Sequence, residues 1–415
     1  MAATRKNLRA ALGAACGLIG ISGTAARATE VDTAVLAYTE PDRVSAIEAV
    51  VNMNHEFASG NSANFRIVYD ALTGASASGA VPAATAQTYT RPSGSGSYET
   101  PAGETPLDDT FRDTRFAFTG GGTLALNRLT KLSGGLYGST EHDYTSLGAN
   151  ASLTRDYNKK RTSFTLRTAF FRDTISPEGG RPDPLAEMRP AGLSQPRLNG
   201  DGSKDTAEAG LAWTQVLGRA TIAQVNYTLS SVTGYQTDPY KIVSQVDPVT
   251  GAPVAQLFES RPEDRLKNVL FSKMNHNLGR DIVSLSYRFM TDDWGINSHT
   301  VDLTYRWNFA HRQHLQPHLR WYKQGAADFY QRYLVSGETL PGNVSADYRL
   351  GDMTAYTVGL KYGRKLSNGR DFSIRAEYYL QTGDGPADPI GDLAGYDLLP
   401  DVDAIFIQVG YSFGL

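Results

Sequence analysis

Hydrophobic and polar residues alternate along much of this chain with a period of two. In the segment 405–415, IFIQVGYSFGL, every odd position is apolar or aromatic and most even positions are small or polar. The segments 301–309, VDLTYRWNF, and 372–380, FSIRAEYYL, repeat the pattern. Successive side chains of a β-strand point to opposite faces, so the pattern predicts strands that each carry one apolar and one polar face.

An apolar strand face must be covered by the core of a soluble β protein or by the acyl chains of a membrane. The period of two places about sixteen strands, within a range of about 14 to 18. The predicted strands are 31–40, 43–57, 63–72, 111–126, 131–142, 145–157, 161–176, 204–217, 220–236, 264–278, 281–294, 298–310, 314–329, 352–366, 371–384 and 403–415.

The connections between these strands decide between the two environments. Every second connection is short: 58–62, 127–130, 158–160, 218–219, 279–280, 311–313 and 367–370. The intervening ones include all the long segments: 73–110, 177–203, 237–263, 330–351 and 385–402. Short periplasmic turns on one rim and long extracellular loops on the other are typical of outer-membrane barrels, whereas a sandwich or propeller has no reason to separate loops by length.

We therefore predict an all-β fold, a transmembrane antiparallel up-and-down β-barrel that occupies residues 29–415. In a bilayer every backbone N–H and C=O must be paired within the protein, and a closed sheet achieves this without helices. Closure also removes the exposed sheet edge that would otherwise aggregate. An even number of strands places both termini on the periplasmic side.

The first 28 residues have the pattern of a secretory signal peptide. Arg5, Lys6 and Arg9 precede an apolar run over 10–22, and the small residues around Ala28 predict cleavage after it. A short buried helix is the alternative, and Cys16 in the run allows lipidation as a further one. We expect 1–28 to be removed and the protein to reside in the outer membrane.

Composition excludes several classes of function. Removal of 1–28 takes away the only cysteine and four of the 40 basic groups, leaving 36 against 43 acidic groups and a formal net charge of about −7. Nucleic acid is therefore not expected as a partner. No later segment has the roughly 18 consecutive apolar residues of a membrane helix.

The polar strand faces are predicted to line a lumen. The candidate lumen and selectivity residues are Arg66, Arg167, Arg288, Asp302, Arg306, Arg320, Arg375 and Glu377. They are interpreted either as a charged constriction that selects solutes by sign or as a salt-bridged ladder that braces the barrel, and both interpretations stay open. A barrel of about sixteen strands is wide enough for an aqueous channel, which an inward-folded loop such as 73–110 would narrow or plug.

Dense polar motifs lie at the predicted extracellular ends of the strands. The candidate residues of this outer rim are Asp70, Asp238, Tyr240, Asp292, Asp293, Trp294, His299, Asp328, Tyr330 and Asp384. The aspartates are a weak candidate set for Ca²⁺, which prefers several oxygen ligands, and ordinary turn chemistry is the alternative. No other cofactor is expected. The chain contains no nucleophile elbow, HExxH motif, Walker loop or CxxCH motif, so enzymatic activity is not expected.

The rim motifs also carry a resemblance. In order, DALTGAS, TGYQTDPYK, SRPEDR, DDWGINSHTVDL and QGAADFY resemble the bacterial family called domain of unknown function 3570, over essentially the whole mature chain. The resemblance implies an outer-membrane barrel without an established activity, and it carries over no catalytic residue.

These observations predict a pore or transporter that passes a solute or docks an exported partner. The alternative is a non-conducting structural or receptor-like barrel whose loops bind a ligand, a cation or a partner protein. Expected partners are outer-membrane lipid, lipopolysaccharide and the barrel-assembly machinery, together with a possible exported protein.

The segment 405–415 resembles the closing strand of a barrel, whose last residues also act as an assembly signal; here the signal residues are Tyr411, Phe413 and Leu415. Deleting 414–415 keeps the alternation and leaves a terminal aromatic ring, so assembly is expected to persist. Replacing Tyr411 and Phe413 by Asp puts charge on the apolar face and is expected to abolish assembly. Heat-modifiable gel migration of membrane fractions measures both, and normal insertion of the double variant would contradict the assignment.

Overall fold

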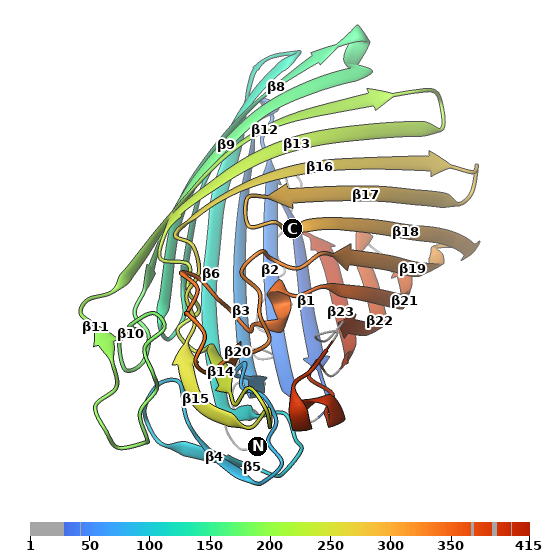
Figure 1. Cartoon of the computed structure of the whole chain (residues 1–415). Helices are drawn as coiled ribbons and strands as arrows, with labels where there is room; N and C mark the ends of the chain where they lie inside the picture. The colour runs from blue at the N-terminus through green and yellow to red at the C-terminus, as the bar shows by residue number, and fades with distance from the viewer. Residues whose placement is uncertain (1–28, 42, 367–368, 384–387, 400) are drawn as a thin grey trace.

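The computed structural model describes residues 29–415 except 42, 367–368, 384–387 and 400. Over these residues the chain forms one closed barrel of antiparallel strands, joined in chain order (Figure 1). The barrel strands are β1 (Thr29–Thr39), β2 (Val44–Glu56), β3 (Ser62–Ala77), β6 (Leu107–Asn127), β7 (Thr130–Thr140), β8 (Tyr144–Tyr157), β9 (Thr162–Ile175), β12 (Gly202–Val216), β13 (Thr221–Gly234), β16 (Asp264–Asn277), β17 (Ile282–Asp292), β18 (Asn297–Ala310), β19 (Gln313–Gln324), β21 (Met353–Lys365), β22 (Asp371–Gly383) and β23 (Val402–Gly414).

The predicted fold class is confirmed, and each predicted strand corresponds to one of the sixteen described barrel strands. Three boundaries differ for a physical reason. Strands β3 and β6 extend past the rim because they continue to pair with each other, through a register shift after Gly74, as far as Ala77 and Leu107. Strand β19 ends at Gln324, earlier than predicted, because the following residues leave the sheet and pack into the loops.

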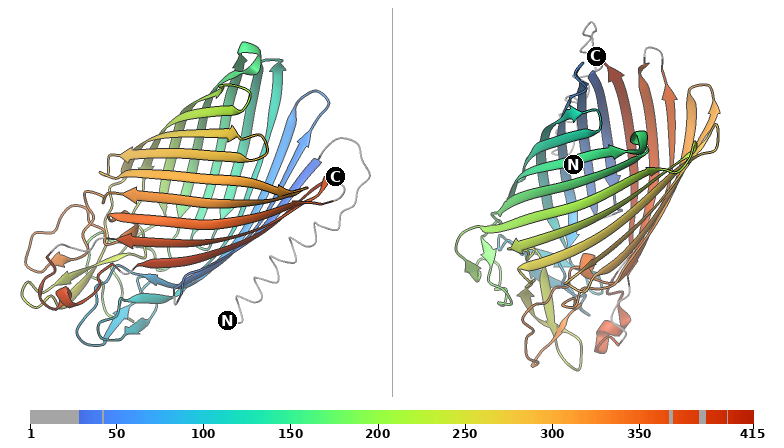
Figure 2. Two further views of the ribbon diagram at one scale, coloured as in Figure 1. Left: turned by 90° about the vertical axis from the view of Figure 1, so that its right-hand side faces the viewer. Right: turned by 90° about the horizontal axis from the view of Figure 1, so that it is seen from above.

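The barrel closes where β1 pairs with β23. Their register places Val31 opposite Phe413 and Thr33 opposite Tyr411, so the two ends of the described chain lie on the same rim. That rim carries the short turns. The long connections gather at the opposite end of the barrel (Figures 1 and 2).

The outer surface of the barrel is apolar. Large side chains on alternate positions are exposed there, including Phe116, Leu136, Leu147, Leu166, Leu211, Leu319, Val358, Leu360, Ile405 and Ile407. The described helices are three short 3-10 turns, η1 (Asn158–Lys160), η2 (Tyr348–Leu350) and η4 (Gly391–Gly395), and none of the described helices is long and apolar enough to cross a membrane.

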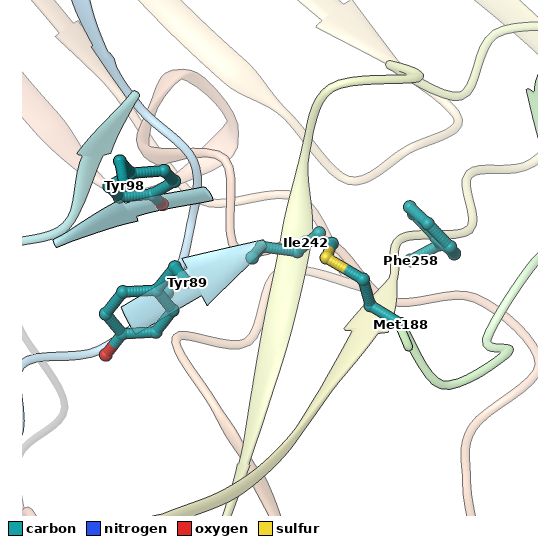
Figure 3. Packing of buried hydrophobic residues seen from close by; sticks show 6 residues of the cluster. Tyr89, Tyr98, Met188, Ile242 and Phe258 are labelled. Atoms are coloured by element: carbon teal, nitrogen blue, oxygen red, sulfur yellow. The ribbon is translucent and has the colours of Figure 1, made fainter. Parts of the chain in front are cut away.

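The five long connections pack into one unit, here called the cap, formed by the described residues of 78–106, 176–201, 235–263, 325–352 and 384–401. Its short strands are β4 (Gln87–Thr90), β5 (Ser97–Thr100), β10 (Arg181–Pro182), β11 (Arg197–Leu198), β14 (Ile242–Val246), β15 (Pro253–Phe258) and β20 (Leu334–Val335). The cap has an apolar core, in which Tyr89, Met188, Ile242 and Phe258 come from three different loops (Figure 3). Burial of apolar area from several loops fixes their mutual arrangement.

Arg332 ties three cap loops together. Its guanidinium is buried and donates to the carbonyl oxygens of Leu398 at 2.6 Å, Gly79 at 2.6 Å and Ala80 at 3.0 Å. Burial lowers the pKa of this arginine from its usual range. The five donors of arginine satisfy carbonyl groups that would otherwise be buried without partners, which costs about 1–3 kcal/mol each.

Substituting Arg332→Met is therefore expected to loosen the cap and leave the barrel closed. Proteinase K should cleave the cap loops at least about tenfold faster, the rate change that about 1.4 kcal/mol of local opening gives. Heat-modifiable gel migration should stay as in the wild type. The control is Arg189→Met, an exposed arginine that bonds only within its own loop; equal cleavage of the two variants would show that Arg332 does not hold the cap.

Candidate functional site

The strand register places all eight predicted lumen residues on the inner face. Asp302 lies opposite Arg320, and Arg320 lies opposite Thr357, which faces Tyr379 beside Glu377. The same alternation holds for the others, which are Arg66, Arg167, Arg288, Arg306 and Arg375. Their strand neighbours on the opposite face include the exposed apolar side chains of the outer surface.

A histidine bridges two carboxylates on this inner face. His318 on β19 makes hydrogen bonds through Nε2 to Asp302 Oδ2 at 2.8 Å and through Nδ1 to Glu377 Oε1 at 2.9 Å. Glu377 lies on β22, so the second contact crosses the whole of β21. It does so over Gly359, where a Cβ would lie 2.5 Å from Glu377 Cγ. Strand parity alone places His318 in the lumen, but a contact between non-adjacent strands gives no local signal in the sequence.

Cations form a column beside this bridge. Arg288, Arg320 and Lys361 face the lumen, and among the described residues none of the three makes an ion pair or side-chain hydrogen bond. Lys361 lies directly opposite Arg375, whose own ion-pair partner is Glu377 at 3.6 Å. Like charges opposed across a sheet repel each other. These three cations therefore form no direct ion pair, although the carboxylates of Asp302 and Glu377 lie near Arg320. A brace built of direct ion pairs would not leave three cations in this state.

An acidic hollow adjoins this part of the wall, near the cap. It has a volume of about 620 Å³ and is bounded by the inner faces of β22, β23, β1, β2, β3 and β6 together with Tyr348 and Arg349 of η2. Its lining includes Glu40, Glu48, Asp70, Asp113 and Glu141, and the aromatic rings of Tyr38, Tyr379 and Phe406. Burial and the neighbouring charge of Asp113 raise the pKa of Glu141, which lies in the connection after β7, to about 7.

Two further hollows continue along the wall from this one. The second, of about 470 Å³, shares Tyr379 and Phe406 with the first and is lined by His318, Arg320 and Glu377. The third, of about 460 Å³, lies at the rim of short turns and contains Arg306 and His314. The carboxylates of the acidic hollow all lie within residues 40–141, whereas the hollow at the turn rim is lined by cations and no carboxylate.

The predicted rim residues have mostly structural partners. Asp70 forms an ion pair with Arg115 at 2.7 Å inside the acidic hollow. Asp238 accepts from Arg349 at 2.7 Å, and the hydroxyl of Tyr240 donates to Asp143. The contacts of Asp238 and Tyr240 join different connections at the barrel end, whereas Asp70 and Arg115 face each other on the paired strands β3 and β6.

A group of buried ions extends from Asp238. Arg261 lies 2.6 Å from Glu259 and 2.9 Å from Asp347, and Arg349 also binds Asp347. Burial raises the pKa of Glu259 to about 7, against the opposing charge of Arg261. Burial would also raise the pKa of Asp347, but the charge and hydrogen bonds of Arg349 outweigh it and hold that pKa well below its usual range. The group fastens the loop 235–263 to the loop 325–352.

The remaining rim residues support a second apolar cluster. Trp294 packs against Phe329, with ring centroids 5.0 Å apart, and Tyr330 packs beside them. Asp292 binds Arg265, whose guanidinium lies over the Trp294 ring at 4.1 Å.

The other rim candidates make separate contacts. Asp293 accepts from the backbone of Leu266, and the backbone N–H of Asp328 donates to Trp294. His299 lies on the outer face of β18, where it bonds Tyr287. Asp384 lies outside the described residues. In the described part of the chain, no three His, Cys, Asp or Glu side chains form a group that could hold a metal ion.

The predicted assembly residues lie on the outer face at the turn rim. Phe413 packs with Val31 and Val51 of the first two strands, and Tyr411 and Leu415 pack against this group. The apolar face of the last strand therefore contacts the strands that it closes against.

Comparisons with known proteins add a family. Residues 8–413 match the family model described as "Protein of unknown function (DUF3570)". No curated protein matches the sequence.

Solved structures with a similar fold share little sequence with this chain. CdiB from Acinetobacter baumannii has 8% identity and a TM-score of 0.48, over 94% of this chain and 61% of that one. Two proteins of Pseudomonas aeruginosa, the outer membrane protein opdK and OccK3 (OpdO), each have 8% identity over 94% of this chain and 99% and 96% of theirs, with TM-scores of 0.40 and 0.41. This chain thus spans about three fifths of the length of CdiB.

The contact between His318 and Glu377 across β21 can be tested by substitution. Gly359→Ala pushes Glu377 away from His318, and His318→Leu removes the same contact, so each is expected to lower the free energy of unfolding by about 1–2 kcal/mol. Combined, they should cost no more than the larger single change, because the contact can be lost only once. Denaturant unfolding in detergent measures the cycle, with Gly218→Ala, which contacts nothing within 4 Å, as the neutral control. Additive losses would contradict the bridge.

Proposed function

The chain belongs to the family described as protein of unknown function (DUF3570), and we propose that it forms a channel through which small polar solutes cross the outer membrane. The observation that carries the proposal is the column of Arg288, Arg320 and Lys361 on the inner wall, three cations that form no ion pair among the described residues. Unpaired charge is costly in a barrel interior filled by side chains, and it is favourable where water and mobile ions reach it.

The location in the outer membrane rests on the exterior of the barrel. A closed sheet with exposed leucine, valine and isoleucine on alternate positions matches a hydrocarbon environment. The short turns then lie in the periplasm and the cap outside the cell. Export by cleavage of 1–28 is part of this proposal, and those residues lie outside the described ones.

The column also indicates which solutes are favoured. An anion that follows the wall from the second hollow to the third passes Arg320, Lys361 and Arg306 in an environment of lower dielectric constant than water, where charge attraction is stronger. The carboxylates of the acidic hollow come from β2, β3, β6 and the connections after β1 and β7, whereas the cation column lies on β17, β19 and β21. We propose a channel with preference for small anions or for solutes that carry an anionic group.

The packed cap favours a second candidate function, a receptor-like barrel that binds a ligand or an exported partner outside the cell. Its loops are held by an apolar core and by the buried ions around Arg261, so they present a fixed surface. Fixed loops lower the entropy cost of binding. Lipid, lipopolysaccharide and the barrel-assembly machinery remain expected partners in both cases.

Single-channel recording in planar bilayers tests the channel. The wild type should give ohmic steps with preference for chloride over potassium, and Arg288→Glu with Arg320→Glu should lower that permeability ratio by about fivefold, which corresponds to about 1 kcal/mol of altered charge interaction. The control pair, Arg128→Glu with Lys159→Glu, makes the same charge change at exposed turn residues and should leave the ratio unchanged. Silent bilayers from folded barrels would overturn the channel and favour the receptor-like barrel.

A further inference from the structure

The third hollow, at the turn rim of the lumen, has a composition unlike the rest of the wall. It is lined by Arg280, Arg306, Asn308, Ala310, His311, Arg312, Gln313, His314 and Lys365, and this lining contains no carboxylate. Its volume of about 460 Å³ is within the usual range of small-molecule sites. We propose that this basic pocket binds a phosphate group, and the binding does not require that the barrel conducts.

The cations of the basic pocket are available to a ligand. Among the described residues, the side chains of Arg280, Arg312 and Lys365 make no ion pair or hydrogen bond. Arg306 bonds only neutral groups, Asn308 Oδ1 at 3.3 Å and His314 Nδ1 at 3.2 Å. The pocket therefore collects four positive charges whose mutual repulsion a multivalent anion would relieve.

Two neighbouring carboxylates, Asp281 and Asp371, form no ion pair with these cations. Asp281 accepts hydrogen bonds from the backbone of Asn308 at 2.8 Å and from the hydroxyl of Tyr305 at 2.8 Å. Asp371 lies opposite Lys365 in the strand register without forming an ion pair with it. Guanidinium and ammonium groups grouped in this way are the usual protein ligands of phosphate.

Backbone contacts hold the pocket in shape before any ligand binds. The Lys365 N–H donates to the Arg312 carbonyl at 2.8 Å, which fastens the turn after β18 to the end of β21. The side-chain amide of Asn308 donates to the Arg280 carbonyl at 2.6 Å, which fastens the turn before β17 to β18. Cations carried on fastened turns lose little freedom on binding.

Two local features accompany the turn after β18. Arg312 has a φ of 63°, a left-handed conformation that costs a residue with a Cβ about 1 kcal/mol. Gly363 leaves room for the His314 ring, since a Cβ there would lie 2.1 Å from His314 Cε1.

The test uses the full barrel, purified in a neutral detergent without phosphate, and inorganic phosphate as the titrant in calorimetry. The wild type should bind phosphate saturably, and Arg312→Gln with Lys365→Gln should weaken the dissociation constant by at least about tenfold. The control, Arg128→Gln with Lys159→Gln, removes two exposed turn charges elsewhere and should bind as the wild type does. Heat-modifiable migration verifies that each variant is folded.

Two further arms separate a soluble phosphate from a lipid headgroup. The titration is repeated in nanodiscs of phosphatidylcholine and of phosphatidylglycerol. Phosphate binding retained in both membranes supports a soluble phosphate compound as ligand, and loss confined to phosphatidylglycerol supports a headgroup in the same pocket. No saturable binding by the wild type in detergent, or equal affinity of the pocket variant and the control, would overturn the site.

Discussion

The pairing of β1 with β23 is the constraint on which the rest of this structure depends. A chain that crosses hydrocarbon must satisfy every backbone N–H and C=O internally, and without this pairing two strand edges would face lipid unpaired. Closure requires one consistent register for all the strands between them. The alternation of faces sets that register, because a slip by one residue would exchange the apolar and the charged face. The positions of Arg288, Asp302 and Arg320 on one inner face are a consequence of that register.

Glycines on the inner face then let side chains interact beyond their neighbouring strands. Glu377 reaches His318 over Gly359, and in the same way Arg167 reaches Thr228 across β12, where a Cβ on Gly210 would lie 2.5 Å from Arg167 Nε. Such contacts pair some charges across a strand and leave others unpaired. The positions of glycine on the inner face, together with the positions of charge, therefore decide which side chains can pair across an intervening strand.

The barrel could be predicted from the sequence because its signals are local. The period of two and the alternation of short and long connections can both be recognised within a few residues of each strand. Each predicted strand corresponds to one described barrel strand, with ends that differ by a few residues. The cap could not be predicted, because its contacts join distant loops: Arg332 bonds Gly79 and Leu398, and Trp294 packs on Phe329. For the same reason the sequence suggests the rim aspartates as Ca²⁺ ligands, whereas in the structure Asp238 and Asp292 bind arginines from elsewhere in the chain. The sequence does not reveal the basic pocket, because its four cations come from separate turns and strands.

The cap bounds one of the three hollows described above, and the barrel alone lines the other two. The acidic hollow is bounded by η2, so access to it depends on the loop 325–352 and on the buried ions that hold this loop. The hollow around His318 and Arg320 and the basic pocket are lined by barrel strands and turns alone. Buried ion pairs contribute little net stability, and their better-supported use is to fix one arrangement among several. In this chain they fix the loop 325–352, and with it η2, against the acidic hollow.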